Sequence, residues 1–180
     1  MDNTAVLLII ASEGFEPTEY HDTKKVIAAA GFPVVTASDK LGTAIGKDGS
    51  KVPVEMSLDQ VDTHNYAGVF FIGGPGALEH LDNNTSYKIA QETVFQNKPI
   101  GAICISTRIL AKSGVLHDKD ATGWNKDGEL DKIFAENNVH YLPTEKVVVE
   151  SNVITATDPS VATDFGMHIV ELLQNQQRWG

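Results

Sequence analysis

Gly101-Ala102-Ile103-Cys104-Ile105-Ser106-Thr107-Arg108-Ile109-Leu110 contains the only cysteine of the chain and combines the patterns of a strand and of a helix. The apolar run that begins at Ile100 is typical of a short buried strand, and from Ile105 the apolar residues recur at helical spacing. We therefore predict that Cys104 lies where a strand turns into a helix. The first N–H groups of a helix have no partner within it, and together with the helix dipole they favour a thiolate. A lone cysteine in an apolar run is nevertheless more often an inert buried side chain than a nucleophile, so a second feature must decide.

Segments on both sides of this stretch predict a parallel sheet. Residues 5–11 are continuously apolar, as in a central parallel strand, and a helix over about 16–30 followed by a strand over 32–37 completes a βαβ unit. Further strands are expected at 66–72, 100–103, 121–124, 139–142, 146–150 and 153–156, and further helices at 77–81, 86–96, 129–136 and 160–174. This order predicts an α/β fold: a single domain over 1–180 with a flavodoxin-like, mainly parallel sheet and helices on both faces.

Two segments stand apart from this alternation of strands and helices. Residues 12–15 are expected to form the turn after the first strand. The glycines at 42, 46 and 49 predict a small β-hairpin over about 39–54, which caps one edge of the sheet or contacts another subunit.

Composition excludes several classes of function. The net charge of −10 repels a phosphate backbone, and the lysines and arginines are scattered, so nucleic acid is not an expected partner. A single cysteine cannot form an intramolecular disulfide, which favours a reducing compartment. The first four residues contain no basic segment, and the apolar run 5–11 is too short to cross a bilayer. We expect a cytoplasmic protein that does not bind membranes.

Three strand ends carry unusual residues. Ligands of open parallel sheets bind at the carboxyl ends of the strands, where this chain has the segment 14–19, the run Gly73-Gly74-Pro75-Gly76 and the Cys104 turn. We interpret Cys104 as a candidate nucleophile and Glu19 as a carboxyl group beside it. The glycine run is positioned to bring backbone N–H groups close to an oxyanion.

These three segments also resemble the motifs of a known family. Members of the ThiJ/PfpI superfamily carry an acidic loop Gly-Phe-Glu-x-x-Glu, a Gly-Gly turn and an Ala-Ile-Cys elbow, which correspond here to residues 14–19, Gly73-Gly74 and 102–104. The resemblance extends over nearly the whole chain. The superfamily includes deglycases, intracellular protease-like proteins and glyoxalases.

The resemblance implies specific roles for residues of this chain. Cys104 would be the nucleophile, Glu19 a buried, protonated carboxyl partner, and the backbone N–H groups of Gly74 and Ile105 the oxyanion donors. Gly73 and Ser106 are expected to line the pocket with Trp124 and Asp158. The resemblance also implies a homo-oligomer, a dimer or larger.

The chain departs from the family pattern at several positions. Protease-like members have histidine directly after the cysteine, where this chain has Ile105, so proteolysis is the less expected activity. Trp124 is interpreted as a pocket wall or as ordinary core, and Asp158 as a pocket residue or, more commonly for such a position, the N-cap of the last helix. The histidines at 21, 117, 140 and 168 are interpreted as structural or solvated.

The sequence indicates neither a metal nor an organic cofactor. No cluster of His, Cys and Asp has ligand spacing, and the glycine run at Gly73 lacks the Lys-Ser/Thr of a phosphate loop.

Two functional hypotheses follow. In the first, the protein is a cysteine-dependent enzyme of glyoxalase, deglycase or amidase type, in which Cys104 attacks a small carbonyl compound and Glu19 moves the proton. In the second, it is a redox-sensing or stress-response protein in which Cys104 is oxidised without turnover. Both hypotheses use the same residues, so the sequence does not choose between them.

Overall fold

A seven-stranded sheet runs through the centre of the computed structural model, which describes residues 4–179. Its order is β11-β12-β8-β7-β1-β3-β6, and all neighbours are parallel except β11 and β12. The strands are β1 Val6–Ile9, β3 Val34–Ser38, β6 Met56–Ser57, β7 Gly68–Phe71, β8 Ile100–Ile103, β11 Val147–Glu150 and β12 Val153–Ala156. The order β3-β1-β7-β8-β12 is the doubly wound arrangement of flavodoxin, which confirms the predicted fold class.

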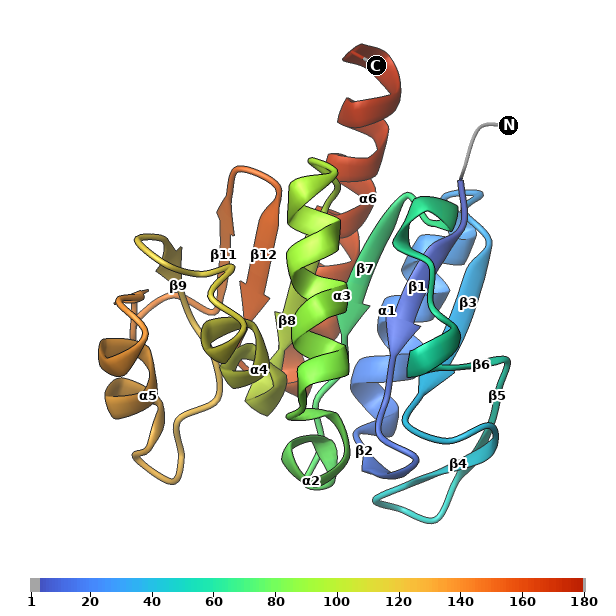
Figure 1. The fold of residues 1–180 in the computed structure, drawn as a ribbon, viewed down its shortest axis with the longest axis horizontal. Helices are drawn as coiled ribbons and strands as arrows, with labels where there is room; N and C mark the ends of the chain where they lie inside the picture. Colours follow the sequence, from blue (N-terminus) through green and yellow to red (C-terminus); the bar gives the residue numbers. More distant parts are fainter. Residues whose placement is uncertain (1–3, 180) are drawn as a thin grey trace.

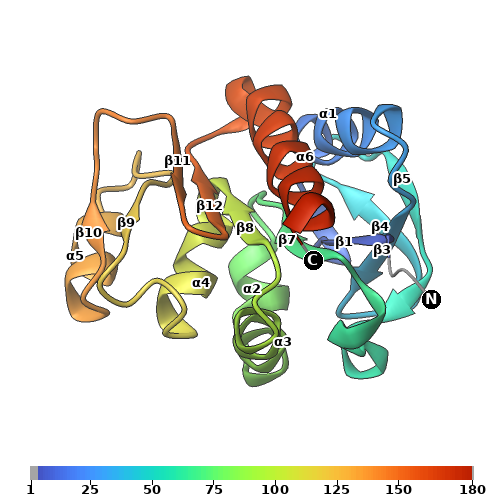
Figure 2. The same ribbon diagram turned by 90° about the horizontal axis from the view of Figure 1, so that it is seen from above.

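Helices cover both faces of this sheet (Figure 2). The first and last helices lie side by side on one face, and the helices from the middle of the chain lie on the other. The first group is α1 Pro17–Ala29 and α6 Ala162–Trp179, and the second is α2 Ala77–Leu81, α3 Asn84–Phe95 and α4 Thr107–Lys112. A further helix, α5 Leu130–Glu136, lies beyond the β11 edge beside the short parallel strands β9 Asp120–Ala121 and β10 His140–Tyr141 (Figure 2).

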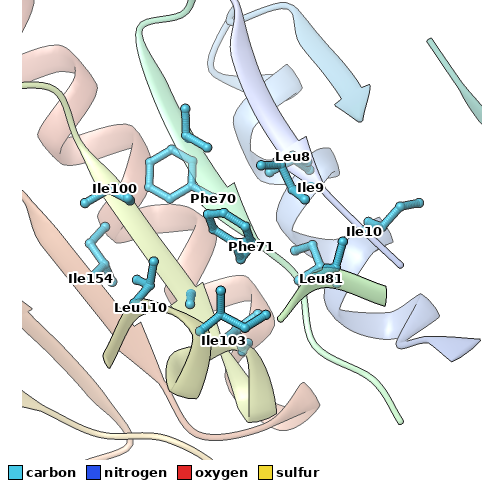
Figure 3. Close-up of a cluster of buried hydrophobic side chains, with 14 of the residues drawn as sticks. Leu8, Ile9, Ile10, Phe70, Phe71, Leu81, Ile100, Ile103, Leu110 and Ile154 are labelled. Atoms are coloured by element: carbon cyan, nitrogen blue, oxygen red, sulfur yellow. The ribbon is translucent and has the colours of Figure 1, made fainter. Parts of the chain in front are cut away.

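The core explains why the central strands are continuously apolar. Every residue of β1, β7, β8 and β12 is buried, because helices pack on both faces of these strands. Figure 3 shows side chains of this cluster, including Ile9, Phe71 and Ile103. Phe70 meets Phe165 of α6 edge to face, with ring centres 6.2 Å apart. Each such fully buried side chain stabilises the fold by about 1.5–3 kcal/mol, which fixes the strand ends that carry the site.

The predicted hairpin is present as β4 Gly42–Gly46 and β5 Lys51–Val54, which pair antiparallel. The prediction of a simple turn at 12–15 was wrong, because Glu13–Phe15 forms the short strand β2 and pairs with β4. The Ile45 N–H donates to the Ser12 carbonyl at 2.8 Å, and the Lys47 N–H donates to the Phe15 carbonyl at 2.9 Å. The hairpin therefore lies beside the loop that leads into α1.

Smaller differences concern element ends. The strand expected at 121–124 covers only Asp120–Ala121, because the Trp124 N–H donates to the Cys104 carbonyl at 3.3 Å instead. The last helix begins at Ala162, after a 3₁₀ turn, and runs to Trp179. The sequence prediction that the first four residues contain no basic segment includes residues 1–3, which lie outside the described residues. None of the helices in residues 4–179 has the length and apolar composition that a membrane span requires.

Candidate active site

Cys104 lies at the strand–helix junction that the sequence predicts. It follows β8 directly, begins the 3₁₀ turn Cys104–Ser106, and α4 follows. Its backbone has φ +64°, a left-handed conformation that costs a residue other than glycine about 1–3 kcal/mol. The Thr107 hydroxyl donates to the Cys104 carbonyl at 3.1 Å and, with the Trp124 N–H, holds the turn in place. The fold thus orders a sharp bend at the thiol, at the carboxyl end of a central strand.

Glu19 brings a buried carboxyl group to this thiol from the first turn of α1, which begins with Pro17 after the Glu16 N-cap. The Glu19 side chain is fully buried, and its Oε2 accepts a hydrogen bond from the Gly73 N–H at 2.8 Å. The carboxyl group also contacts the Cys104 thiol, whereas Oε1 has no nitrogen or oxygen partner among the described residues. Burial raises the pKa of Glu19 from 4.5 to about 8, so at neutral pH this carboxyl group is protonated.

Burial also raises the pKa of the Cys104 thiol, and a negative charge on Glu19 raises it further. The backbone N–H groups of Ile105 and Gly74 hydrogen-bond the sulfur and act in the opposite direction, but burial outweighs them. The N–H groups therefore act in the direction that the sequence predicts, but in the resting site they do not overcome the effect of burial. Because Glu19 is protonated below about pH 8, its repulsion of a thiolate is small at neutral pH. The two groups form a pair that shares protons.

Two glycines allow this close packing. A Cβ atom on Gly73 would lie 2.6 Å from the Cys104 Cβ and 2.7 Å from Glu19 Oε2, so no side chain fits there. Gly74 has φ +122°, and its Cβ would lie 2.4 Å from the Gly14 carbonyl oxygen. The absence of a side chain lets the Gly74 N–H face the sulfur. Gly73 itself is a spacer between Glu19 and Cys104 and is not part of the pocket wall, which corrects the prediction made for it.

A cavity of about 520 Å³ opens at the thiol. Cys104 is only 9% exposed, so the sulfur is recessed but borders the cavity. The parallel strands end at the bottom of Figure 1, where β2, α2 and the start of α4 lie. The residues lining the cavity come from the loops at this end of the sheet: Glu16, Lys47, Gly74, Pro75, Cys104, Ile105, Trp124, Lys126, Asp158 and Pro159.

Trp124 and Asp158 both line the cavity, as the sequence predicts. The Arg108 guanidinium lies 5.5 Å from the centre of the Trp124 ring, and its Nη2 donates to the Trp124 carbonyl at 3.3 Å. Asp158 is at the same time the N-cap of the 3₁₀ turn Pro159–Val161 and accepts from the Ser160 N–H at 2.9 Å. Partial burial raises the pKa of Asp158, but hydrogen bonds from Ser160 and Thr157 outweigh it and the pKa is lowered.

Ser106 does not line the cavity, contrary to the prediction. Its side chain is fully buried, and its hydroxyl donates to the Ile72 carbonyl at 2.7 Å. In this 3₁₀ turn the residue two positions after Cys104 points toward the sheet, so its role is to tie the turn to the end of β7.

Sequence reasoning missed two lysines of the cavity. Lys47, in the hairpin, forms an ion pair with the Glu16 carboxylate, which is itself only 6% exposed. The hydrogen bond with Glu16 is the main cause that raises the pKa of Lys47, and the charges of Glu19 and Cys104 contribute. Lys126 lies two residues after Trp124 and is exposed at the cavity. The pairing of β4 with β2 brings Lys47 to the site, and no local sequence pattern signals that pairing.

The histidines do not enter the site. None of the residues that line the cavity in the described part of the chain is a histidine. His117, His140 and His168 each lie beside an exposed acidic residue, and His21 packs edge to face on Tyr20. Within residues 4–179, no group of three or more His, Cys, Asp or Glu side chains is arranged to hold a metal ion.

Comparison with known proteins agrees with this architecture. A model of the DJ-1/PfpI family matches residues 4–172. An uncharacterized protein of Methanocaldococcus jannaschii is 31% identical over 175 residues, which cover 97% of this chain and 84% of that protein. The Bacillus subtilis protein YraA, proposed to be a cysteine protease, is 28% identical over 93% of this chain and 98% of its own length. The crystal structure of a ThiJ/PfpI domain protein from Brachyspira murdochii superimposes with a TM-score of 0.91 at 25% identity, covering 97% of this chain and 99% of that one. These matches confirm the resemblance inferred from the sequence motifs: the chain belongs to the DJ-1/PfpI family.

Proposed function

We propose that the protein is a cysteine-dependent enzyme for small carbonyl compounds, of glyoxalase, deglycase or amidase type. Cys104 is the nucleophile, and Glu19 is its proton partner. The observation that carries this proposal is a fully buried carboxyl group, protonated at neutral pH, in contact with a thiol that borders a cavity. A buried acid of this kind costs stability, and perturbed acids of this kind gather at functional sites.

At neutral pH Glu19 and Cys104 both hold a proton. The reaction begins when the thiol proton is lost to solvent, which leaves a minor form with a Cys104 thiolate beside a protonated Glu19. The Cys104 sulfur attacks the aldehyde carbon, so that an S–C bond forms, the C=O π bond breaks and the Glu19 proton goes to the oxygen. The product is a hemithioacetal, and Glu19 is left as a carboxylate. With a 2-oxoaldehyde, Glu19 then takes the proton from the same carbon and returns it to the neighbouring carbon. The hydroxyl proton of the hemithioacetal moves to the neighbouring oxygen, so that the C–OH becomes the C=O of a thioester and the ketone becomes a hydroxyl. One water molecule hydrolyses the thioester to the 2-hydroxy acid and the free thiol.

The backbone provides the charge stabilisation that the first step needs. The N–H groups of Gly74 and Ile105 are directed at the sulfur, so they lie beside the carbon it attacks. A carbonyl oxygen that becomes negative there would be held by fixed donors in a largely buried site. Removal of one such donor costs about 100-fold to 1000-fold in kcat in comparable sites.

Turnover of methylglyoxal tests the proposal. Wild type should convert it, Cys104→Ser should show no rate above background, and Glu19→Gln should lose most of the rate while still folding. The exposed Glu136→Gln variant on α5 is the matched control and should keep wild-type activity. If wild type shows no rate with methylglyoxal, glycated peptides or small amides, the enzyme proposal fails.

Two other functions are weighed against this one. Peptide hydrolysis is not proposed, because no histidine is among the cavity residues described and Ile105 follows the cysteine. Redox sensing is the second candidate, because the lone thiol is recessed against an acid that can donate a hydrogen bond to an oxidised sulfur. Absence of turnover combined with stoichiometric oxidation of Cys104 by hydrogen peroxide, followed by mass spectrometry, would favour it. The homo-oligomer implied by the family is likewise a proposal, which light scattering tests.

A further inference from the structure

Four charged side chains line the cavity, and they differ in whether other residues already bind them by ion pairs or hydrogen bonds. Glu16 and Lys47 neutralise each other in an ion pair. Asp158 is occupied by hydrogen bonds, accepting from the Ser160 N–H at 2.9 Å and from the hydroxyls of Ser160 and Thr157. Lys126 is the one of the four whose side chain has neither an ion pair nor a hydrogen bond within residues 4–179. The Lys126 ammonium group is therefore the cation of the cavity that is available to a ligand.

The position of Lys126 is fixed by the helix that follows the nucleophile. Arg108 of α4 is 3% exposed, and its Nη2 donates both to the Trp124 carbonyl at 3.3 Å and to Asp127 Oδ1 at 2.6 Å. These two acceptors lie on either side of Lys126 in the sequence. The loop is further closed by the Leu130 N–H, which donates to Asn125 Oδ1 at 2.9 Å. Lys126 is thus an exposed side chain on an anchored loop.

The cavity has room for more than the reacting carbonyl group. Its volume of about 520 Å³ lies in the range of pockets that enclose drug-sized ligands. Pro75, Ile105 and Trp124 make much of its wall apolar. Beside apolar walls a charge pair is less screened than in water, so a single ammonium group there discriminates between charged and neutral ligands.

We propose, as an extension of the proposed function, that the natural substrates are carbonyl compounds that also carry a carboxylate, and that Lys126 binds this carboxylate. The carbonyl carbon then lies at the Cys104 sulfur, and the rest of the ligand lies along Trp124. Two carboxylates line the cavity, and Lys47 neutralises the charge of Glu16, so Asp158 is the one left to oppose such an anion. Its hydrogen bonds with Ser160 and Thr157 weaken that repulsion. Lys126 is a specificity-determining residue that takes no part in the bond changes at Cys104.

Alkylation of the only cysteine tests this inference without any turnover. Iodoacetate and iodoacetamide differ little in size but differ by one negative charge, and each adds once to Cys104, which intact-protein mass spectrometry counts. The measured quantity is the ratio of the two second-order rate constants, iodoacetate over iodoacetamide. Lys126→Gln should lower this ratio about fivefold, the effect of one partly screened charge. Lys88→Gln, which removes an exposed lysine on α3, should leave the ratio unchanged.

The ratio of the two alkylation rate constants tests carboxylate binding by Lys126, and turnover tests the proposed function. An unchanged ratio in Lys126→Gln, or an equal fall in Lys88→Gln, overturns carboxylate binding by Lys126. As a second readout, the KM for 4-carboxyphenylglyoxal should rise about fivefold in Lys126→Gln, while the KM for phenylglyoxal and both kcat values should stay unchanged. A rise in KM for both compounds also overturns the inference. Absence of turnover with both compounds in wild type counts against the enzyme, while the alkylation ratio still reports on Lys126.

Discussion

Replacement of Glu19 by Gln should change how the stability of the protein depends on pH. Burial raises the Glu19 pKa from 4.5 to about 8 in the folded chain, whereas the unfolded chain keeps the ordinary value. Between these two pH values the folded state binds one proton more than the unfolded state. The stability that this proton supplies is fully present below pH 4.5 and is lost as the pH rises through about 8.

The size of the effect follows from the pKa shift. A rise from 4.5 to about 8 corresponds to roughly 5 kcal/mol over that pH range, or about 1.4 kcal/mol per pH unit. Glu19→Gln has no proton to lose at this position, and its side-chain oxygen can still accept from the Gly73 N–H. The free energy of unfolding of wild type, measured relative to the Gln variant, should therefore fall by about that amount as the pH is raised.

Urea unfolding measures this difference. Curves for wild type and Glu19→Gln would be recorded from pH 4.5 to 8, where the Cys104 thiol is protonated in both the folded and the unfolded chain. Glu136→Gln removes an exposed carboxyl group on α5 and serves as the control. A difference between wild type and Glu19→Gln that is the same at every pH would show instead that Glu19 titrates at its ordinary value in the folded chain.

Three further substitutions test neighbouring parts of the site. Ser106→Ala should cost about 1 kcal/mol in urea unfolding, because the buried Ile72 carbonyl loses its donor. The alkylation rate of Cys104 should not change, and a changed rate at full stability would place Ser106 at the cavity after all. Gly74→Ala should lower the free energy of unfolding by more than about 2 kcal/mol, because φ is +122° and the added Cβ would lie 2.4 Å from the Gly14 carbonyl oxygen. Wild-type stability of this variant in urea would contradict the turn geometry. Lys47→Gln should cost about 1–3 kcal/mol by leaving the Glu16 carboxylate buried without its cation. The double variant Lys47→Gln with Glu16→Gln should recover part of that loss of stability in the same assay. If the double variant is as unstable as Lys47→Gln alone, the loss of the ion pair is not the cause.

Much of the fold is predictable from the sequence because the signals are local. The apolar runs of β1, β7, β8 and β12 are continuous because helices cover both faces, and the order of strands and helices then allows few topologies. The Cys104 elbow is predictable for the same reason, since a strand and a helix meet there. The place of Glu19 beside Cys104 is predictable only when the three strand ends are combined with the family motifs.

The errors concern contacts that local patterns do not encode. Lys47 reaches the site only because β4 pairs with β2, and a segment of three residues carries no strand signal. Ser106 was misplaced because its side chain turns toward the Ile72 carbonyl in a 3₁₀ turn, and the sequence does not show the geometry of that turn. The direction of the Cys104 pKa shift was also misjudged, because the sequence shows the helix end but not the depth of burial that outweighs it.

Titration of the Cys104 thiolate reports whether Cys104 and Glu19 share protons in the folded protein. Because the chain has one cysteine, the ultraviolet absorbance of its thiolate can be followed with pH in wild type and in Glu19→Gln without interference from another thiol. We expect a wild-type midpoint above the ordinary value of about 8.5, and a lower midpoint in Glu19→Gln, which has lost the negative charge that opposes the thiolate. A wild-type midpoint at or below the ordinary value, or equal midpoints in the two proteins, would contradict this expectation.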